Sequence, residues 1–179
     1  MKYYISDLHI GHANCIAFDE RPFFTLEEMH ETMIERWNSV VTKNDDVYIL
    51  GDVAWHNPTG VEVLKKMNGN KFLILGNHDR VNPELKEQFV WVKDYAIIKD
   101  GGAHVVLCHY PLAVWRSSDY GYIHLYGHIH KGRDVRPIQE FLKIMKDRDI
   151  PHECHNVGCM MPYMDYTPRT LQQIREMDK

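Results

Sequence analysis

Several features that define other classes of protein are missing from this sequence. No stretch approaches the roughly 18 to 20 apolar residues of a membrane span, because Asp7 and His9 interrupt the apolar start. The cysteines, at positions 15, 108, 154 and 159, form no CxxC pair, and no secretory segment precedes them. We therefore expect a cytoplasmic protein with reduced thiols and no membrane contact.

An excess of basic residues is also missing. The formal net charge is -4, so bulk electrostatics give no support to nucleic-acid binding. Histidine, by contrast, is abundant, with 12 residues in a chain of 179. Because histidine is the commonest metal ligand in proteins, this abundance favours a metal site.

The chain contains no internal repeat and no low-complexity segment. With 179 residues, 44% of them hydrophobic, we expect a single domain over residues 1–179. Strand-like runs alternate with helix-like ones, which predicts an α/β fold with largely parallel pairing. We expect strands at 2–6, 46–50, 71–75, 96–99, 104–108, 123–126 and 154–157, and helices at 26–41, 59–67, 83–89 and 137–147.

Two helices carry recognisable start signals. Thr25, with Glu28 three positions later, resembles a capping box ahead of the 26–41 helix. A last helix should follow Thr167 and Pro168, since threonine can cap a helix and proline can occupy its first turn.

Polar clusters follow successive apolar runs: SDLH, LGDVAWH, LGNHD, LCHYP and LYGHIH. In open α/β sheets, ligands collect beyond the carboxyl ends of the strands, so these clusters should meet at one site. They supply carboxylate, amide and imidazole groups, which suit borderline divalent ions such as manganese, iron or zinc. The candidate ligands are Asp7, His9, Asp52, Asn77, His109, His128 and His130. Seven ligands exceed the needs of one ion, so two ions that share a carboxylate fit better.

The motifs DLH, GD, GNHD, CHYP and GHIH, in this order, resemble the motif series of the calcineurin-like metallophosphoesterases. The segments RPF, ERWN, HYPLAVW and HLYGHIH extend the likeness to small bacterial and phage members, so it covers most of the chain. The resemblance implies a four-layer αββα sandwich, in which two mixed sheets are flanked by helices.

The resemblance also implies a role for each ligand. Asp7, His9 and His130 would hold the first metal, and Asp52 would bridge the two ions. Asn77, His109 and His128 would hold the second metal. The pair of divalent ions would be Mn, Fe, Zn or Ni, and His78 would be a histidine that meets the substrate without binding metal.

Three further residues are candidate substrate contacts, each with an ordinary alternative. His12 could face the site or begin a helix as a solvated residue. Arg21 could bind phosphate through its fork of donors or lie on the surface. His124 precedes His128 by four residues and so shares its face in a strand, but it could equally be a buried core histidine. Asp79 could orient His78, although we favour a helix cap.

These observations predict a dinuclear metal-dependent phosphoesterase in which a metal-bound hydroxide attacks phosphorus and His78 assists the leaving group. The substrate would be a phosphodiester, a nucleotide or a phosphomonoester. One alternative is a nuclease acting on DNA or RNA, which should show a basic stripe leading to the site. The other is a non-catalytic metal-binding scaffold with the same fold.

Overall fold

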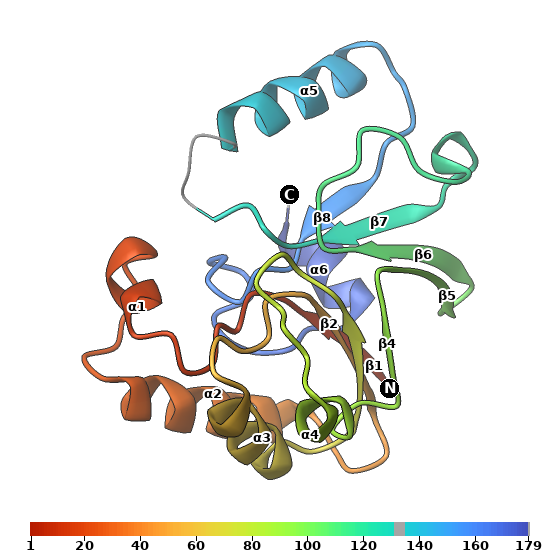
Figure 1. Cartoon of the computed structure of the whole chain (residues 1–179). Coiled ribbons are helices and arrows are strands. Elements are labelled where there is room, and N and C mark those ends of the chain that lie inside the picture. Colours follow the sequence, from red (N-terminus) through yellow and green to blue (C-terminus); the bar gives the residue numbers. More distant parts are fainter. Residues whose placement is uncertain (131–134, 179) are drawn as a thin grey trace.

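Two four-stranded sheets form the centre of the protein (Figure 1). The computed structural model describes residues 1–130 and 135–178. The first sheet is entirely parallel and runs in the order β1 (Lys2–Ile5), β2 (Asp46–Leu50), β3 (Asn70–Ile74) and β4 (Trp91–Lys93). The second runs in the order β5 (Tyr95–Asp100), β6 (Ala103–Cys108), β7 (Ile123–Tyr126) and β8 (Cys154–Asn156), with only the β5–β6 pair antiparallel.

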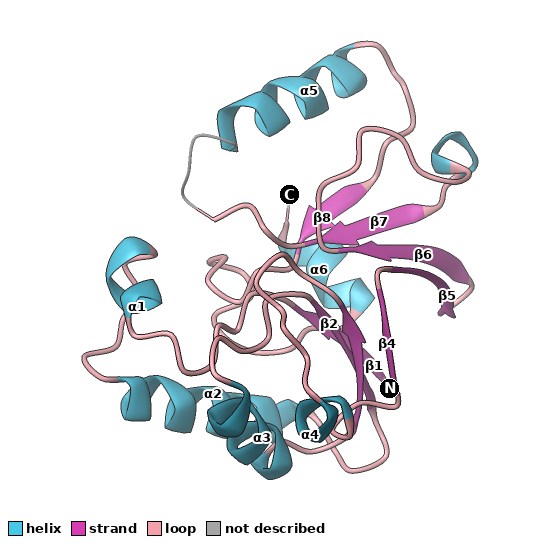
Figure 2. Cartoon of the chain, viewed as in Figure 1, coloured by secondary structure: helices cyan, strands magenta, loops and turns pink. Residues whose placement is uncertain are grey.

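Helices flank this pair of sheets (Figure 2). They are α1 (Asn14–Phe18), α2 (Leu26–Val40), α3 (Asn57–Lys66), α4 (Pro83–Lys86), α5 (Val135–Asp147) and α6 (Leu171–Met177), with a 3₁₀ turn, η1, at Ser118–Tyr120. Figure 1 shows α2, α3 and α4 together on the side of the first sheet, and α5 beyond the second. The arrangement confirms the expected sandwich of two sheets flanked by helices, although only the second sheet is mixed, since every strand pair in the first is parallel. In the described part of the chain, no helix is long and apolar enough to cross a membrane.

The strand register brings the loops that carry polar residues to one edge. Ile5 pairs with Ile49, and Leu50 pairs with Ile74, so β1, β2 and β3 end level with one another. Parallel strands that end level deliver their following loops to the same edge of the sheet. A bridge between Ser6 and Gly158 then links the end of β1 to the segment after β8.

Helix α2 forms for the reasons that its sequence indicates. The Thr25 hydroxyl accepts a hydrogen bond from the Glu28 backbone N–H at 3.1 Å, which satisfies a free donor in the first turn. Met29, Met33 and Trp37 fall on one face and are buried against the sheet core.

The start of the last helix differs from the prediction. Thr170, not Thr167, caps α6, and it forms a reciprocal capping box with Gln173. Arg169 is still paired with Tyr4 of β1 through two backbone hydrogen bonds, so the chain stays extended until that residue. Pro168 therefore lies outside the helix. The short elements α1 and β4 were not predicted.

Candidate metal centre

The loops after β1, β2 and β7 adopt an uncommon backbone conformation at the candidate ligands. Asp7, His9, Asp52 and His128 have φ angles of 57°, 49°, 51° and 68°, in the left-handed region. Asp and His tolerate this region better than most residues, and such conformations concentrate at functional sites. Hydrogen bonds from the Asp7 N–H to the Gly51 carbonyl and from the His9 N–H to the Asp52 carbonyl hold two of these loops together.

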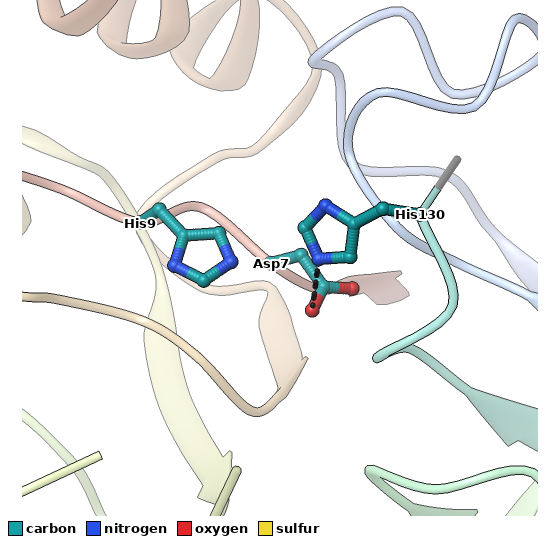
Figure 3. Close-up of side chains that lie close together, drawn as sticks. All are labelled: Asp7, His9 and His130. Atoms are coloured by element: carbon teal, nitrogen blue, oxygen red, sulfur yellow. Dashed lines mark ion pairs between the residues drawn. The ribbon is translucent and has the colours of Figure 1, made fainter. Parts of the chain in front are cut away.

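The structure gathers six candidate ligands into two clusters. Asp7, His9 and His130 form the first, and Asp52, His109 and His128 form the second. In each cluster, one potential ligand atom per residue lies within 4.8 Å of the others. Figure 3 shows the first cluster converging, with His130 Nε2 at 3.4 Å from Asp7 Oδ1.

Asp52 lies between the clusters. Its Oδ2 atom is 3.7 Å from His9 Nε2 in the first cluster and 3.6 Å from His109 Nε2 in the second. Its Oδ1 atom accepts a hydrogen bond from the His78 backbone N–H at 2.9 Å, which fixes the carboxylate orientation. One oxygen of Asp52 therefore faces a histidine of each cluster.

His9 provides the observation that tests whether metal fits here. Its Nε2 atom is buried and has no hydrogen-bond partner in the described structure. Burial lowers the pKa of His9 to about 3, so the ring is neutral and Nε2 can offer a lone pair. Leaving a buried polar atom without a partner is costly, and a cation at this point would supply the missing interaction. The donor set, carboxylate and imidazole without thiolate, suits a borderline divalent ion.

The charges of Asp7 and His130 depend on one another. Burial alone would raise the pKa of Asp7, but the hydrogen bond and charge of His130 outweigh it and lower that pKa to about 2. Burial alone would lower the pKa of His130, but hydrogen bonds to Asp19 and Asp7 raise it to about 9. Without metal, a proton on His130 thus occupies the place where a cation would bind.

Two of the candidate ligand histidines are oriented by a contact of their Nδ1 atom. His109 Nδ1 is 2.7 Å from the Leu50 carbonyl oxygen, and His130 Nδ1 is 2.7 Å from Asp19 Oδ1. In each case the contact leaves Nε2 pointing toward the cluster. Such supporting partners fix ring orientation and raise ligand basicity. Asp19 was missed in the sequence, where no motif marks it.

Arg21 is buried, so it is neither the phosphate contact nor the surface residue that the two expected alternatives described. Its side chain is fully buried and donates to Asp19 Oδ2 at 2.9 and 3.0 Å. It also donates to the backbone carbonyls of Asp7 at 2.9 Å and Leu8 at 3.1 Å. Because every direction of the guanidinium fork is used inside the protein, Arg21 supports the ligand loop and Asp19 instead of binding phosphate.

His124 is also a buried residue and not a substrate contact. Its ring accepts a hydrogen bond from the Leu112 N–H at 3.2 Å and lies 3.2 Å from the Val106 carbonyl oxygen. The expected alternation with His128 fails because β7 ends at Tyr126 and His128 has a left-handed backbone. His124 is therefore a buried core histidine, the second of the two alternatives.

Asn77 and His78 lie where the strand-end pattern placed them. Asn77 Oδ1 is 3.0 Å from His109 Nε2, so the amide oxygen adjoins the second cluster. His78 is exposed, and its ring centroid is 5.8 Å from that of His9. His78 thus faces open space beside the ligands.

His12 lies at the edge of the first cluster, half-buried, with its ring centroid 5.9 Å from that of His9. Its Nδ1 atom accepts a hydrogen bond from the Cys15 N–H at 3.0 Å. In the neutral ring the proton must therefore be on Nε2, which makes that nitrogen a donor. Substrate contact by His12 stays a prediction.

Asp79 ties two of the ligand loops together. Its carboxylate accepts hydrogen bonds from the backbone N–H groups of Asp52 and Val53 at 2.8 Å and of Gly76 at 2.9 Å. The cap of α4 is Asn82, so the expectation that Asp79 caps the next helix was wrong.

Two glycines leave the room that the carboxylates need. A Cβ atom on Gly76 would lie 2.3 Å from Asp52 Oδ1, and one on Gly127 would lie 2.5 Å from Asp7 Oδ2. These distances are far below van der Waals contact. The close approach of Asp52 requires the glycine of GNHD, and that of Asp7 together with Ser6, whose Oγ would lie at 2.0 Å, requires the glycine of GHIH.

Residues 3–157 match the calcineurin-like phosphoesterase family. The chain belongs to this family. An uncharacterised protein of Methanocaldococcus jannaschii is 35% identical over 131 residues, covering 72% of this chain and 68% of the relative. The gene 66 protein of Mycobacterium phage D29 is 35% identical over 158 residues, covering 72% and 77%. A crystal structure of a protein of unknown function from Aquifex aeolicus superposes with a TM-score of 0.75 at 26% identity and covers 98% of both chains.

Membership in the calcineurin-like phosphoesterase family supports metal-dependent hydrolysis of phosphoesters. The family typically binds two metal ions, and this chain presents two Asp/His clusters that could each hold one.

Proposed function

We propose that this protein hydrolyses small phosphoesters with two divalent ions held at the two clusters. The observation that carries the proposal is the position of Asp52 Oδ2, within 3.7 Å of His9 Nε2 and 3.6 Å of His109 Nε2. A carboxylate oxygen between two sets of imidazoles is placed to serve both ions. Asp7, His9 and His130 would hold the first ion, Asn77, His109 and His128 would hold the second, and Asp52 would be shared.

When bound, such a pair of ions activates water near neutral pH and neutralises charge on the phosphoryl group. The protein's own side chains keep the site in shape. Arg21 and Asp19 fix the ring of His130, and the Leu50 carbonyl fixes that of His109. Asp79 holds the loops of Asp52 and Asn77 at a constant separation.

His78 is the proton donor to the leaving oxygen in this proposal. Its backbone N–H is fixed by Asp52 Oδ1, while its ring is exposed beside His9. That combination of a fixed backbone and an accessible ring suits contact with substrate and not with metal. His12, with its Nε2–H free to donate, is placed to bind a phosphoryl oxygen.

The test begins with metal-stripped protein, to which Mn, Fe, Zn, Ni or Mg is restored in turn. Each form is assayed on phosphomonoesters, phosphodiesters, nucleotides, and DNA and RNA oligomers. We expect hydrolysis of the small esters only when metal is restored. Two bound ions without turnover of any ester would overturn the proposal in favour of a metal-binding scaffold. Hydrolysis confined to the oligomers would overturn it in favour of a nuclease.

A further inference from the structure

Two large aromatic side chains beside the first cluster are half exposed. Phe18 is 53% exposed and Trp55 is 54% exposed. Single exposed apolar residues are ordinary on protein surfaces, so exposure alone indicates nothing. The position of these two relative to the candidate metal centre distinguishes them.

Both aromatic rings adjoin residues of the site. The Trp55 ring centroid is 5.3 Å from that of His78 and 4.2 Å from that of His12. The Phe18 centroid is 6.0 Å from that of His130 and 5.7 Å from that of His12. His12 therefore lies between the two, and Phe18, His12 and Trp55 form a continuous group that we call the aromatic rim.

The aromatic rim is anchored to the loops that carry the ligands. The backbone N–H of Trp55 donates to the Ile10 carbonyl at 2.9 Å, next to a bridge between Ile10 and Ala54. Phe18 directly precedes Asp19, whose carboxylate is buried between Arg21 and His130. The backbone at both aromatic residues is thus held at a fixed position relative to the candidate metal centre, which pre-positions them for a ligand bound there.

We propose that the aromatic rim binds the nucleobase of a nucleotide or nucleoside phosphoester. This inference rests on the proposed function and names its substrate class. Aromatic side chains stack on any base because every base has a π face. Trp55 adjoins His78, the proton donor in the proposed reaction, so the stacked nucleoside is the part of the substrate that leaves. Water would form a new P–O bond and give up a proton, the P–O bond to the sugar would break, and His78 would protonate the sugar oxygen.

The experiment compares two ligands that differ only by the base, the non-hydrolysable 5′-phosphonates of adenosine and of ribose. Each is titrated calorimetrically into the full-length, manganese-loaded protein. Stacking on one side chain is worth roughly a tenfold gain in affinity. We therefore expect wild type to bind the adenosine compound at least about 10-fold more tightly than the ribose compound.

Variants separate stacking from a supporting role. Trp55→Ala should lose most of the preference for adenosine and leave the affinity for the ribose phosphonate unchanged, whereas Trp55→Phe should keep most of it. Phe18→Ala should lose part of the preference for adenosine. Tyr120, an 84% exposed aromatic on η1, is the matched control, and Tyr120→Ala should change neither affinity.

Equal affinity of wild type for the two phosphonates would overturn the inference. Equal weakening of both ligands by Trp55→Ala would also overturn it, because Trp55 would then support the phosphoryl end. Hydrolysis of nitrophenyl phosphate esters is measured separately. If the protein hydrolyses the esters but shows no preference for the base, only the nucleobase inference is refuted. If it prefers the base but hydrolyses no ester, the nucleobase inference is supported and the proposed function is refuted.

Discussion

His130 and Asp19 are 111 residues apart in the sequence, and their side chains meet with Nδ1 and Oδ1 at 2.7 Å. The same carboxylate binds the buried guanidinium of Arg21. Asp19 thus links the buried charge of Arg21 to His130, a candidate metal ligand. The contact fixes which nitrogen of His130 faces Asp7.

Replacing Asp19 should weaken metal binding without removing a ligand. In Asp19→Asn, we expect a 10- to 100-fold loss of affinity for one ion, because the amide has one oxygen acceptor and cannot serve both His130 and Arg21 as the carboxylate does. The free energy of unfolding should also fall by about 3 to 5 kcal/mol, since the buried Arg21 loses its anionic partner. Metal titration and thermal unfolding measure the two effects. The matched control is Asp165→Asn, which removes an exposed ion pair with Arg36 and should cost at most about 1 kcal/mol. Unchanged metal affinity in Asp19→Asn would contradict the orienting role.

Loss of the shared carboxylate should affect both ions. Because Asp52 Oδ2 faces His9 and His109, Asp52→Ala should lower the occupancy of both sites in elemental analysis after dialysis. Two tightly held ions in this variant would remove the bridging assignment. The control is His9→Ala, which should deplete one ion more than the other.

Removing the His78 side chain should slow the reaction without releasing the metal ions. His78→Ala should retain both ions and lose roughly 10² to 10⁴ in kcat, the usual range for general acid catalysis. The kcat should fall more for an alkyl ester than for a nitrophenyl ester, because an alkoxide leaving group needs the proton and a nitrophenolate hardly does. Measurements at matched metal content on the two esters check this. Equal losses would favour electrostatic stabilisation, and a loss of metal would make His78 a ligand.

His124 should make the fold sensitive to acid. Burial lowers its pKa to about 4, whereas a histidine in the unfolded chain titrates near 6.5. Protonation therefore favours the unfolded state, so the stabilisation is complete above about pH 6.5 and is lost as the pH falls toward 4. The loss should reach about 2 kcal/mol at pH 5.

Urea unfolding of metal-stripped protein at pH 7.5 and pH 5 measures this effect. His124→Gln keeps an acceptor for the Leu112 N–H but does not titrate, so its stability should fall by less between the two pH values. The same fall in wild type and variant would show that other groups are responsible.

The strand-end positions of the candidate ligands could be predicted because parallel strands impose a simple rule on where their loops go. Asp7, Asp52 and Asn77 each follow an apolar run that becomes a strand. The burial of Met29 and Trp37 followed from helical periodicity in the same way. Both inferences use spacings of only a few residues.

The supporting contacts could not be predicted, since no local spacing encodes them. Asp19 meets His130 across most of the chain. Arg21 was misplaced because two of its partners are backbone carbonyls that any sequence provides and the third, Asp19, is marked by no motif. The strand β4 has three residues, too few to show alternation, and was missed, although the equally short β8 was predicted.

Each cluster draws on both sheets. Asp7 and His9 follow β1 in the first sheet and join His130, which follows β7 in the second; Asp52 follows β2 and joins His109 and His128 from the other side. Neither sheet therefore supplies all the residues of a cluster. A cation at either cluster would cross-link the two sheets. Its binding free energy would therefore stabilise the packing of one sheet on the other, and not either sheet alone.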